Sequence, residues 1–182
     1  MGTTPCVIVI SGLPGAGKST TARAVATRLD RAAHVEADML QAMIVAGGEW
    51  PGPTRPFSAE ADAQLALRLH NACLLARSFV EHGFTAVVDD VVIGDRLPQA
   101  LAELAGVPTR FVMLAPDFEH VRRRWVEQGS PFVDAWGWLD AEMRVRTERV
   151  GVWLDTAHLS AGQAADAILA RLDEAAVATP GP

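Results

Sequence analysis

Positive charge is scarce in this sequence, and almost none of it is lysine. The formal net charge at pH 7 is −6. Nucleic acids and anionic membranes bind proteins through basic faces that displace counterions. We therefore expect neither nucleic acid nor membrane as a partner, and the charge favours a small-molecule substrate.

Cysteine and long apolar runs are also scarce. Cys6 and Cys73 show neither the spacing of a zinc site nor the pattern of a disulfide framework, which favours a reducing, cytoplasmic location. The apolar run at residues 7–10 is too short for a secretory signal or a membrane span. With 182 residues, 49% of them hydrophobic, we expect one α/β domain over residues 1–182.

Lysine occurs once, whereas arginine occurs 15 times. That residue, Lys18, stands in Gly-Leu-Pro-Gly-Ala-Gly-Lys-Ser at residues 12–19, the G-x-x-x-x-G-K-S pattern of a phosphate-binding P-loop. A compact ammonium fits inside such a loop, where a planar guanidinium is too large. The alternative is a glycine-rich turn with a solvated lysine. We expect ATP or GTP to be bound by Gly12, Pro14, Gly15, Ala16, Gly17, Lys18, Ser19 and Thr20.

Five short apolar runs alternate with helical patterns, which predicts a P-loop NTPase fold: a five-stranded parallel sheet with helices on both faces. The expected strands are 6–11, 33–36, 84–89, 110–115 and 151–155, and the expected helices are 18–30, 39–46, 59–82, 98–104, 118–128, 139–150 and 161–177. Further expectations are an acceptor-side excursion at about 47–58, a helical lid at about 129–150 and a disordered tail at about 178–182.

A lone carboxylate, Asp38, follows the second apolar run. Phosphoryl transfer needs a group that accepts the proton of the attacking hydroxyl, and ligands bind at the carboxyl ends of parallel strands. Asp38 is therefore the candidate base. The alternative, compatible with the first, is that Asp38 caps the helix expected from Met39.

Two acids, Asp89 and Asp90, end the third apolar run. An apolar strand that ends in aspartate is typical of the Walker-B arrangement, in which the carboxylate holds Mg²⁺. Side chains alternate along a strand, so only one of the two acids faces the phosphates. We expect Ser19 and Asp89 to hold the metal, and Asp90 to contact a loop or the acceptor.

Arginines gather around residues 129–138, where a closing lid would offset the charge of the transferred phosphoryl group. Val121 and Trp125 mark the buried stripe of the preceding helix, so its three arginines cannot all face the nucleotide. We expect Arg123 or Arg124 to bind the nucleotide, with Arg124 also catalytic. The alternative is a solvated basic face.

The chain has five tryptophans and no tyrosine. The two irregular segments contain Trp50, Trp136 and Trp138. These side chains could form an apolar wall for an acceptor with a ring, or they could pack the loops against the rest of the domain. Arg68 and Asn71 share one face of the long helix. The candidate substrate-binding residues are therefore Asp38, Trp50, Arg68, Asn71 and Asp90.

These motifs resemble those of small P-loop kinases of the chloramphenicol phosphotransferase type, including tunicamycin-resistance proteins and phosphotransferases of capuramycin-type nucleoside antibiotics. Residues 35–40 resemble the segment that holds the base in chloramphenicol phosphotransferase, and residues 88–94 are similar to its Asp-Asp segment. Arg68 with Asn71, and residues 154–156, look like the tunicamycin-resistance pattern. The resemblance spans residues 7–172 and implies an antibiotic acceptor.

Two positions depart from related kinases. Gln41 stands where polynucleotide 5′-kinases have arginine, and Gln128 stands where adenylate-kinase-like lids have a second arginine. The missing lid charge would have to come from Arg144, Arg146 or Arg149.

The sequence thus predicts a Mg²⁺-dependent kinase that transfers the γ-phosphate of a nucleoside triphosphate to a hydroxyl of a small molecule. The alternatives are a nucleoside, sugar or polynucleotide kinase of primary metabolism, or a nucleotide-dependent switch ATPase without an acceptor. The oligomeric state is left open.

Overall fold

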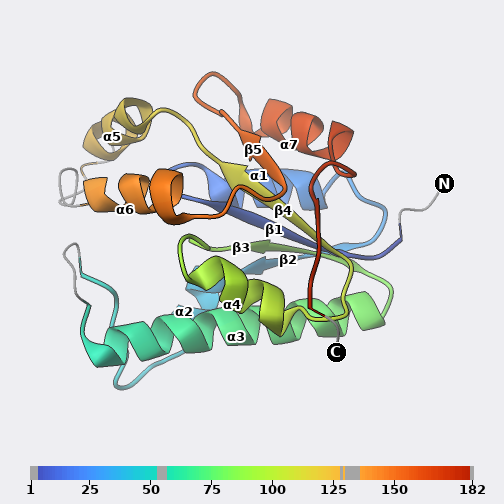
Figure 1. Ribbon diagram of the computed structural model, residues 1–182, viewed down its shortest axis with the longest axis horizontal. Coiled ribbons are helices and arrows are strands. Elements are labelled where there is room, and N and C mark those ends of the chain that lie inside the picture. Colours follow the sequence, from blue (N-terminus) through green and yellow to red (C-terminus); the bar gives the residue numbers. More distant parts are fainter. Residues whose placement is uncertain (1–3, 53–56, 128, 130–135, 181–182) are drawn as a thin grey trace.

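Five parallel strands form the centre of the protein in a computed structural model that describes residues 4–52, 57–127, 129 and 136–180 (Figure 1). The strand order is β2-β3-β1-β4-β5. This order confirms the predicted parallel sheet of a P-loop NTPase fold. The bounds are β1 (Val7–Gly12), β2 (Ala32–Glu36), β3 (Thr85–Asp89), β4 (Thr109–Leu114) and β5 (Val152–Leu154).

Strand β1 lies in the middle of the sheet and is buried along its whole length. It pairs with both β3 and β4, so that Val7 lies opposite Ala86 on one side and Thr109 on the other. A strand covered on both faces needs continuous apolar residues rather than alternation, which is why residues 7–10 are Val-Ile-Val-Ile.

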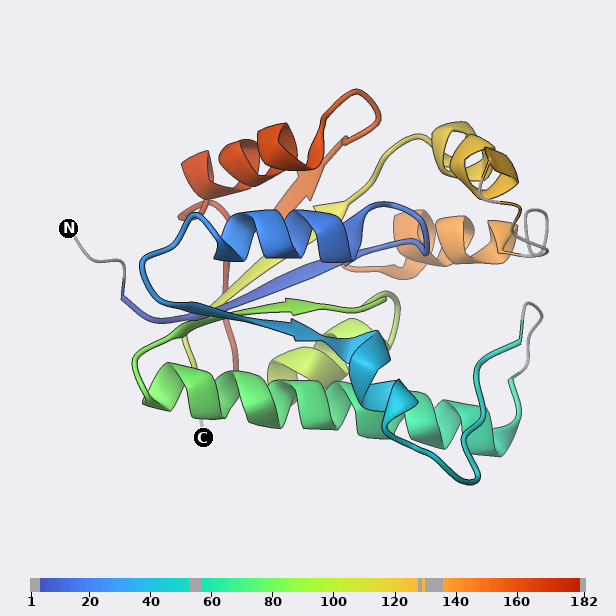
Figure 2. The same ribbon diagram turned by 180° about the vertical axis from the view of Figure 1, so that it is seen from behind.

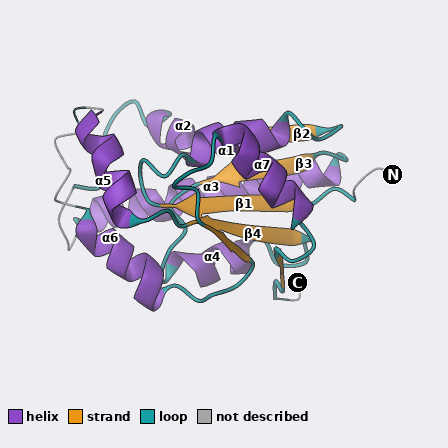
Figure 3. Ribbon diagram, turned by 90° about the horizontal axis from the view of Figure 1, so that it is seen from above, coloured by secondary structure: helices purple, strands orange, loops and turns teal. Residues whose placement is uncertain are grey.

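Helices cover both faces of the sheet (Figures 1 and 3). One face carries α1 (Lys18–Ala26) and α7 (Ala161–Ala170), and the other carries α3 (Ala59–Glu81) and α4 (Arg96–Glu103). The Ser58 side chain accepts a hydrogen bond from the backbone N–H of Ala61, which fixes where α3 begins.

The remaining helical segments lie beyond the carboxyl ends of the strands (Figure 2). They are α2 (Ala37–Ala42), α5 (Phe118–Glu127), α6 (Gly137–Ala141) and a π-helical turn, η1 (Glu142–Arg146). The predicted lid helix at 139–150 therefore begins slightly earlier and ends at Arg146. Residues 53–56, 128 and 130–135 of the predicted excursion, helix and lid lie outside the described residues.

The last predicted helix, 161–177, is wrong in its second half. Helix α7 ends at Ala170, and Ala176–Val177 form a sixth strand, β6, antiparallel to β4. Strand β5 pairs only with residues 112–114 of β4, so the start of β4 would otherwise be an open edge. Strand β6 pairs there with Thr109 and Arg110.

The chain beyond β6 also contacts the body of the protein. The carbonyl of Pro180 accepts a hydrogen bond of 3.1 Å from the backbone N–H of Gly106. Residues 178–180 therefore do not show the expected disorder. Residues 181–182 lie outside the described residues. In the part of the chain that the structure describes, no helix combines the length and apolar character needed to cross a membrane.

Candidate active site

The P-loop connects β1 to α1 and is held from outside by α5. Trp125 of α5 donates its indole N–H to the carbonyl of Pro14 at 3.1 Å. Gly15 has a positive φ of 76°, and a Cβ at this position would collide with the Trp125 indole. Glycine is therefore required at residue 15 both by the backbone conformation and by the docking of α5.

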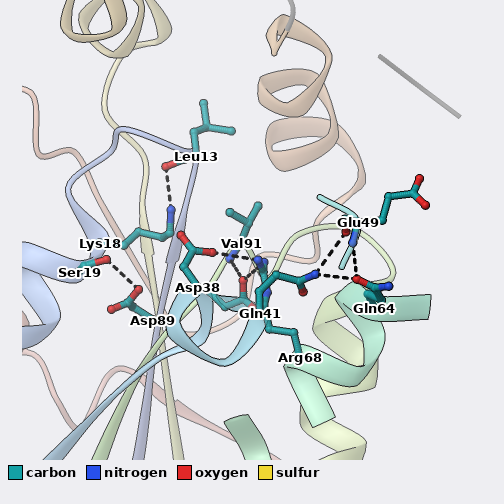
Figure 4. A network of polar contacts seen from close by, with 11 residues as sticks. Leu13, Lys18, Ser19, Asp38, Gln41, Glu49, Gln64, Arg68, Asp89 and Val91 are labelled. Atoms are coloured by element: carbon teal, nitrogen blue, oxygen red, sulfur yellow. Dashed lines mark hydrogen bonds and ion pairs between the residues drawn. The ribbon is translucent and has the colours of Figure 1, made fainter. Parts of the chain in front are cut away.

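Lys18 begins α1 directly after Gly17, which adopts the left-handed conformation with φ 91°. Its ammonium donates a hydrogen bond of 3.1 Å to the carbonyl of Leu13 (Figure 4). Burial lowers the pKa of Lys18, and the carboxylates of Asp38, Asp89 and Asp90 oppose that effect. The ammonium thus lies beneath the loop, where an anionic ligand would stabilise its charged form.

Ser19 and Asp89 form the candidate metal site. The Ser19 hydroxyl donates to Asp89 Oδ1 at 3.0 Å (Figure 4), and the side chain of Asp89 is almost fully buried at the end of β3. A hydroxyl and a carboxylate are hard oxygen donors that fit Mg²⁺. Among the described residues, no group of three or more His, Cys, Asp or Glu side chains could hold a metal by itself. The ion would therefore share its coordination with nucleotide oxygens and water.

His34 is a polar neighbour of this site that the sequence analysis missed. Its Nε2 lies 2.5 Å from Asp89 Oδ2, the oxygen that Ser19 does not contact. His34 is opposite Val87 in the β2–β3 register and therefore shares a face with Asp89, two residues along. Strand alternation could have found this contact only if the pairing of β2 with β3 had been known.

The Asp89→Asn variant should need more Mg²⁺ for nucleotide turnover than Asp90→Asn does. Of the two acids, Asp89 is the one that contacts Ser19, and replacing its carboxylate by an amide removes the charge that attracts the ion. We expect the Mg²⁺ concentration for half-maximal turnover to rise about tenfold or more in Asp89→Asn and to change little in Asp90→Asn. Parallel Mg²⁺ titrations of the two variants test this assignment, and equal midpoints would contradict it.

Arg68 joins Asp38 to Asp90 at the acceptor side. Its Nη1 donates to Asp38 Oδ1 at 2.9 Å, and its Nη2 donates to Asp90 Oδ1 (Figure 4). Arg68 and Asp90 are buried, whereas the Asp38 side chain is 66% exposed. Burial raises the pKa of Asp90, and the Arg68 guanidinium opposes that shift. Arg68, which is fixed in the protein interior by Asp90, therefore orients the accessible carboxylate of Asp38.

The capping role considered for Asp38 is wrong. Helix α2 begins at Ala37, its N-cap is Glu36, and no side chain makes a capping hydrogen bond there. Asp38 lies inside the first turn, where its carboxylate faces Arg68 and Lys18 (Figure 4).

A cavity of about 1050 Å³ brings most of the predicted site together. Its wall runs from the P-loop past Asp38 to aromatic side chains of the excursion and of α6. Thr156, Leu159 and Ser160, which follow β5, also line it. The predicted residues that line it are Pro14, Gly15, Ala16, Gly17, Lys18, Ser19, Thr20, Asp38, Trp50, Arg68 and Arg124.

Some predicted residues lie outside the cavity wall. Arg123 is exposed and does not line the cavity, because the buried stripe of α5 carries Val121 and Trp125 and turns Arg124 rather than Arg123 toward the P-loop. Asn71 is one helical turn beyond Arg68 and does not reach the cavity. Gly12, Asp89 and Asp90 do not line it either: Gly12 ends β1, and the two acids are buried next to Ser19 and Arg68.

A protein-family model described as an AAA domain matches residues 7–147, which is more than half of the chain. The chain belongs to this family of P-loop kinases. The match begins at β1 and ends just after η1, so it includes the P-loop, Asp38, Arg68, Asp89, Asp90 and Arg124. No curated protein matches the sequence.

Solved structures share the fold across almost the whole chain. A tunicamycin resistance protein from Deinococcus radiodurans is 20% identical with a TM-score of 0.67, covering 98% of this chain and 99% of that one. APS kinase from Mycobacterium tuberculosis, in complex with AMPPNP and APS, is 19% identical with a TM-score of 0.68, covering 93% and 98%. Shikimate kinase from Acinetobacter baumannii, in complex with shikimate, is 17% identical with a TM-score of 0.60, covering 91% and 92%. At these identities the likeness concerns the fold.

Proposed function

We propose that this protein transfers the γ-phosphate of ATP or GTP to a hydroxyl group of a small molecule. The observation that carries the proposal is the position of Asp38. Its exposed carboxylate lines the same cavity as Lys18 and the P-loop, and the buried Arg68 holds it there at 2.9 Å. A nucleotide switch could use such a carboxylate to activate water, so the feature that favours a kinase is the cavity of about 1050 Å³ beside Asp38, which has room for an acceptor.

Each side chain has a distinct task in this mechanism. Asp38 accepts the proton of the acceptor hydroxyl as the oxygen attacks, and Arg68 orients the carboxylate. Lys18 binds the terminal phosphates, and Arg124, which lines the cavity beside Gly17, offsets charge on the transferred group. Ser19 and Asp89 would hold Mg²⁺, which neutralises phosphate charge when bound with the nucleotide.

We further propose that the acceptor is an antibiotic, so that phosphorylation would confer resistance. Two observations support this narrower proposal: the motifs around Asp38, Arg68 and Asp89 resemble those of antibiotic kinases, and one structural relative is a tunicamycin resistance protein. Other relatives are named as a gluconokinase and a shikimate kinase, so the acceptor has to be tested directly.

Nucleotide turnover should depend strongly on the acceptor. With ATP or GTP and Mg²⁺, we expect slow hydrolysis alone and a rise of at least about 10²-fold with the right hydroxylated acceptor, because an oriented acceptor replaces a weakly positioned water. The measurement is nucleoside diphosphate release across a panel of hydroxylated antibiotics, nucleosides, sugars and shikimate, with mass spectrometry of the product. Equal turnover with and without every acceptor would instead favour a switch ATPase.

A further inference from the structure

Aromatic side chains form part of the wall of the cavity that the candidate base also lines. Trp136 and Trp138 of the α6 segment are stacked, with ring centroids 6.4 Å apart and 26° between their planes. Phe57 meets Trp138 edge-on at 5.7 Å, and Trp50 adds a ring that is 54% exposed. All four line the cavity that Asp38 and Arg68 also line. The sequence left open whether these tryptophans pin loops or form such a wall.

Among the described residues, the arginines on the acceptor side already hold carboxylates of the protein. Arg68 contacts both Asp38 and Asp90, and Arg96, which also lines the cavity, forms an ion pair of 3.1 Å with Asp62. These contacts place three carboxylates against two guanidinium groups. An anionic acceptor would add a fourth negative charge, and it would have to compete with Asp38 and Asp90 for Arg68.

We infer that the acceptor is an alcohol that carries a flat ring and no negative charge. The ring stacks on the aromatic wall formed by Trp50, Phe57, Trp136 and Trp138, while the hydroxyl reaches Asp38. Flat rings gain from offset stacking and edge-to-face contact with such side chains, and the absence of a negative charge avoids stripping water from an anion beside arginines that already hold carboxylates. This inference rests on the proposed kinase function and names the chemical class of its substrate.

Three probes that share one ring and one hydroxyl test the inference. Methyl 4-(hydroxymethyl)benzoate is neutral, 4-(hydroxymethyl)benzoate is anionic, and 4-(aminomethyl)benzyl alcohol is cationic. Their dissociation constants are measured by NMR titration of the full chain with Mg²⁺ and a non-hydrolysable nucleotide. We expect the anionic acid to bind about tenfold more weakly than the neutral ester or the amine, because its carboxylate must be desolvated beside arginines that already hold carboxylates.

Matched variants of Trp138 test the contribution of the ring. Trp138→Phe retains a flat aromatic surface, whereas Trp138→Leu fills similar apolar space without one. We expect Trp138→Leu to weaken binding of the ester about fivefold or more and Trp138→Phe to weaken it much less, with nucleotide affinity unchanged in both. Equal losses in the two variants would overturn the stacking part of the inference.

The binding results also separate this inference from the kinase proposal. Acid binding as tight as the ester, amine binding as weak as the acid, or no binding of the ester would overturn the substrate class while leaving acceptor-dependent turnover to be judged by diphosphate release. If the probes bind as expected but no acceptor raises turnover, the preference of the cavity for a ring without negative charge stands and the kinase proposal fails.

Discussion

The Lys18→Ala variant is expected to lose phosphoryl transfer by about 10³-fold, because the only ammonium in the P-loop is removed. No other lysine exists to replace it, and the nearby guanidinium of Arg68 is committed to Asp38 and Asp90. Triphosphate affinity should fall as well, since the lysine contacts the β- and γ-phosphates in P-loops. The measurements are diphosphate release and equilibrium binding of the nucleotide.

The same variant should fold at least as stably as the parent protein at neutral pH. Burial lowers the pKa of Lys18 below its ordinary value of 10.5, so the unfolded chain binds this proton more tightly than the folded one. The charged lysine therefore costs stability at pH values below its folded pKa, and this cost disappears as the pH rises toward 10.5. Thermal melts of the ligand-free proteins provide the control. Turnover at the parent rate in Lys18→Ala would reject the P-loop assignment.

The Asp38→Asn variant is expected to lower transfer by roughly 10² or more, with little change in nucleotide affinity. Asparagine keeps the size of the side chain and an oxygen that can accept from Arg68, but it removes the basic site that takes the proton. Because Glu36 and not Asp38 occupies the N-cap of α2, loss of a helix cap cannot account for a lower rate.

Two comparisons make this test specific. Asp62→Asn removes a carboxylate that also pairs with a cavity-lining arginine but does not itself line the cavity, so it should leave transfer largely intact. A Mg²⁺ series separates a base from a metal ligand, because excess metal would restore activity only if Asp38 helped to hold the ion. An unchanged rate in Asp38→Asn would remove Asp38 from the mechanism.

Local patterns were enough to predict the parts of the site that depend on neighbouring residues. The P-loop is a contiguous motif, and strand alternation correctly predicted that Asp89 and Asp90 diverge, one toward Ser19 and one toward Arg68. The contact of Arg68 with Asp38 was not predicted, although both were candidates, because it depends on how α3 packs beside α2.

Features that depend on the assembled sheet were missed or wrong. Residues 176–177 lie in an alanine-rich stretch that favours helix, and they become a strand only because β5 leaves part of the edge of β4 unpaired. The contact of His34 with Asp89 likewise requires the β2–β3 register. The choice between Arg123 and Arg124 depended on the rotation of α5, which Trp125 sets by docking on Pro14.

Strand β1 is synthesised well before either of the strands with which it pairs. It pairs with β3 and β4, and β2 pairs with β3, so no two neighbouring strands are complete before residues 85–89 have been made. Until then Val7–Ile10 is an unpaired apolar segment of high β-propensity, the kind of segment that aggregates or binds chaperones. The arrangement that places the P-loop at the centre of the sheet thus also delays folding, because loop-closure entropy must be overcome before the first long-range pairing forms.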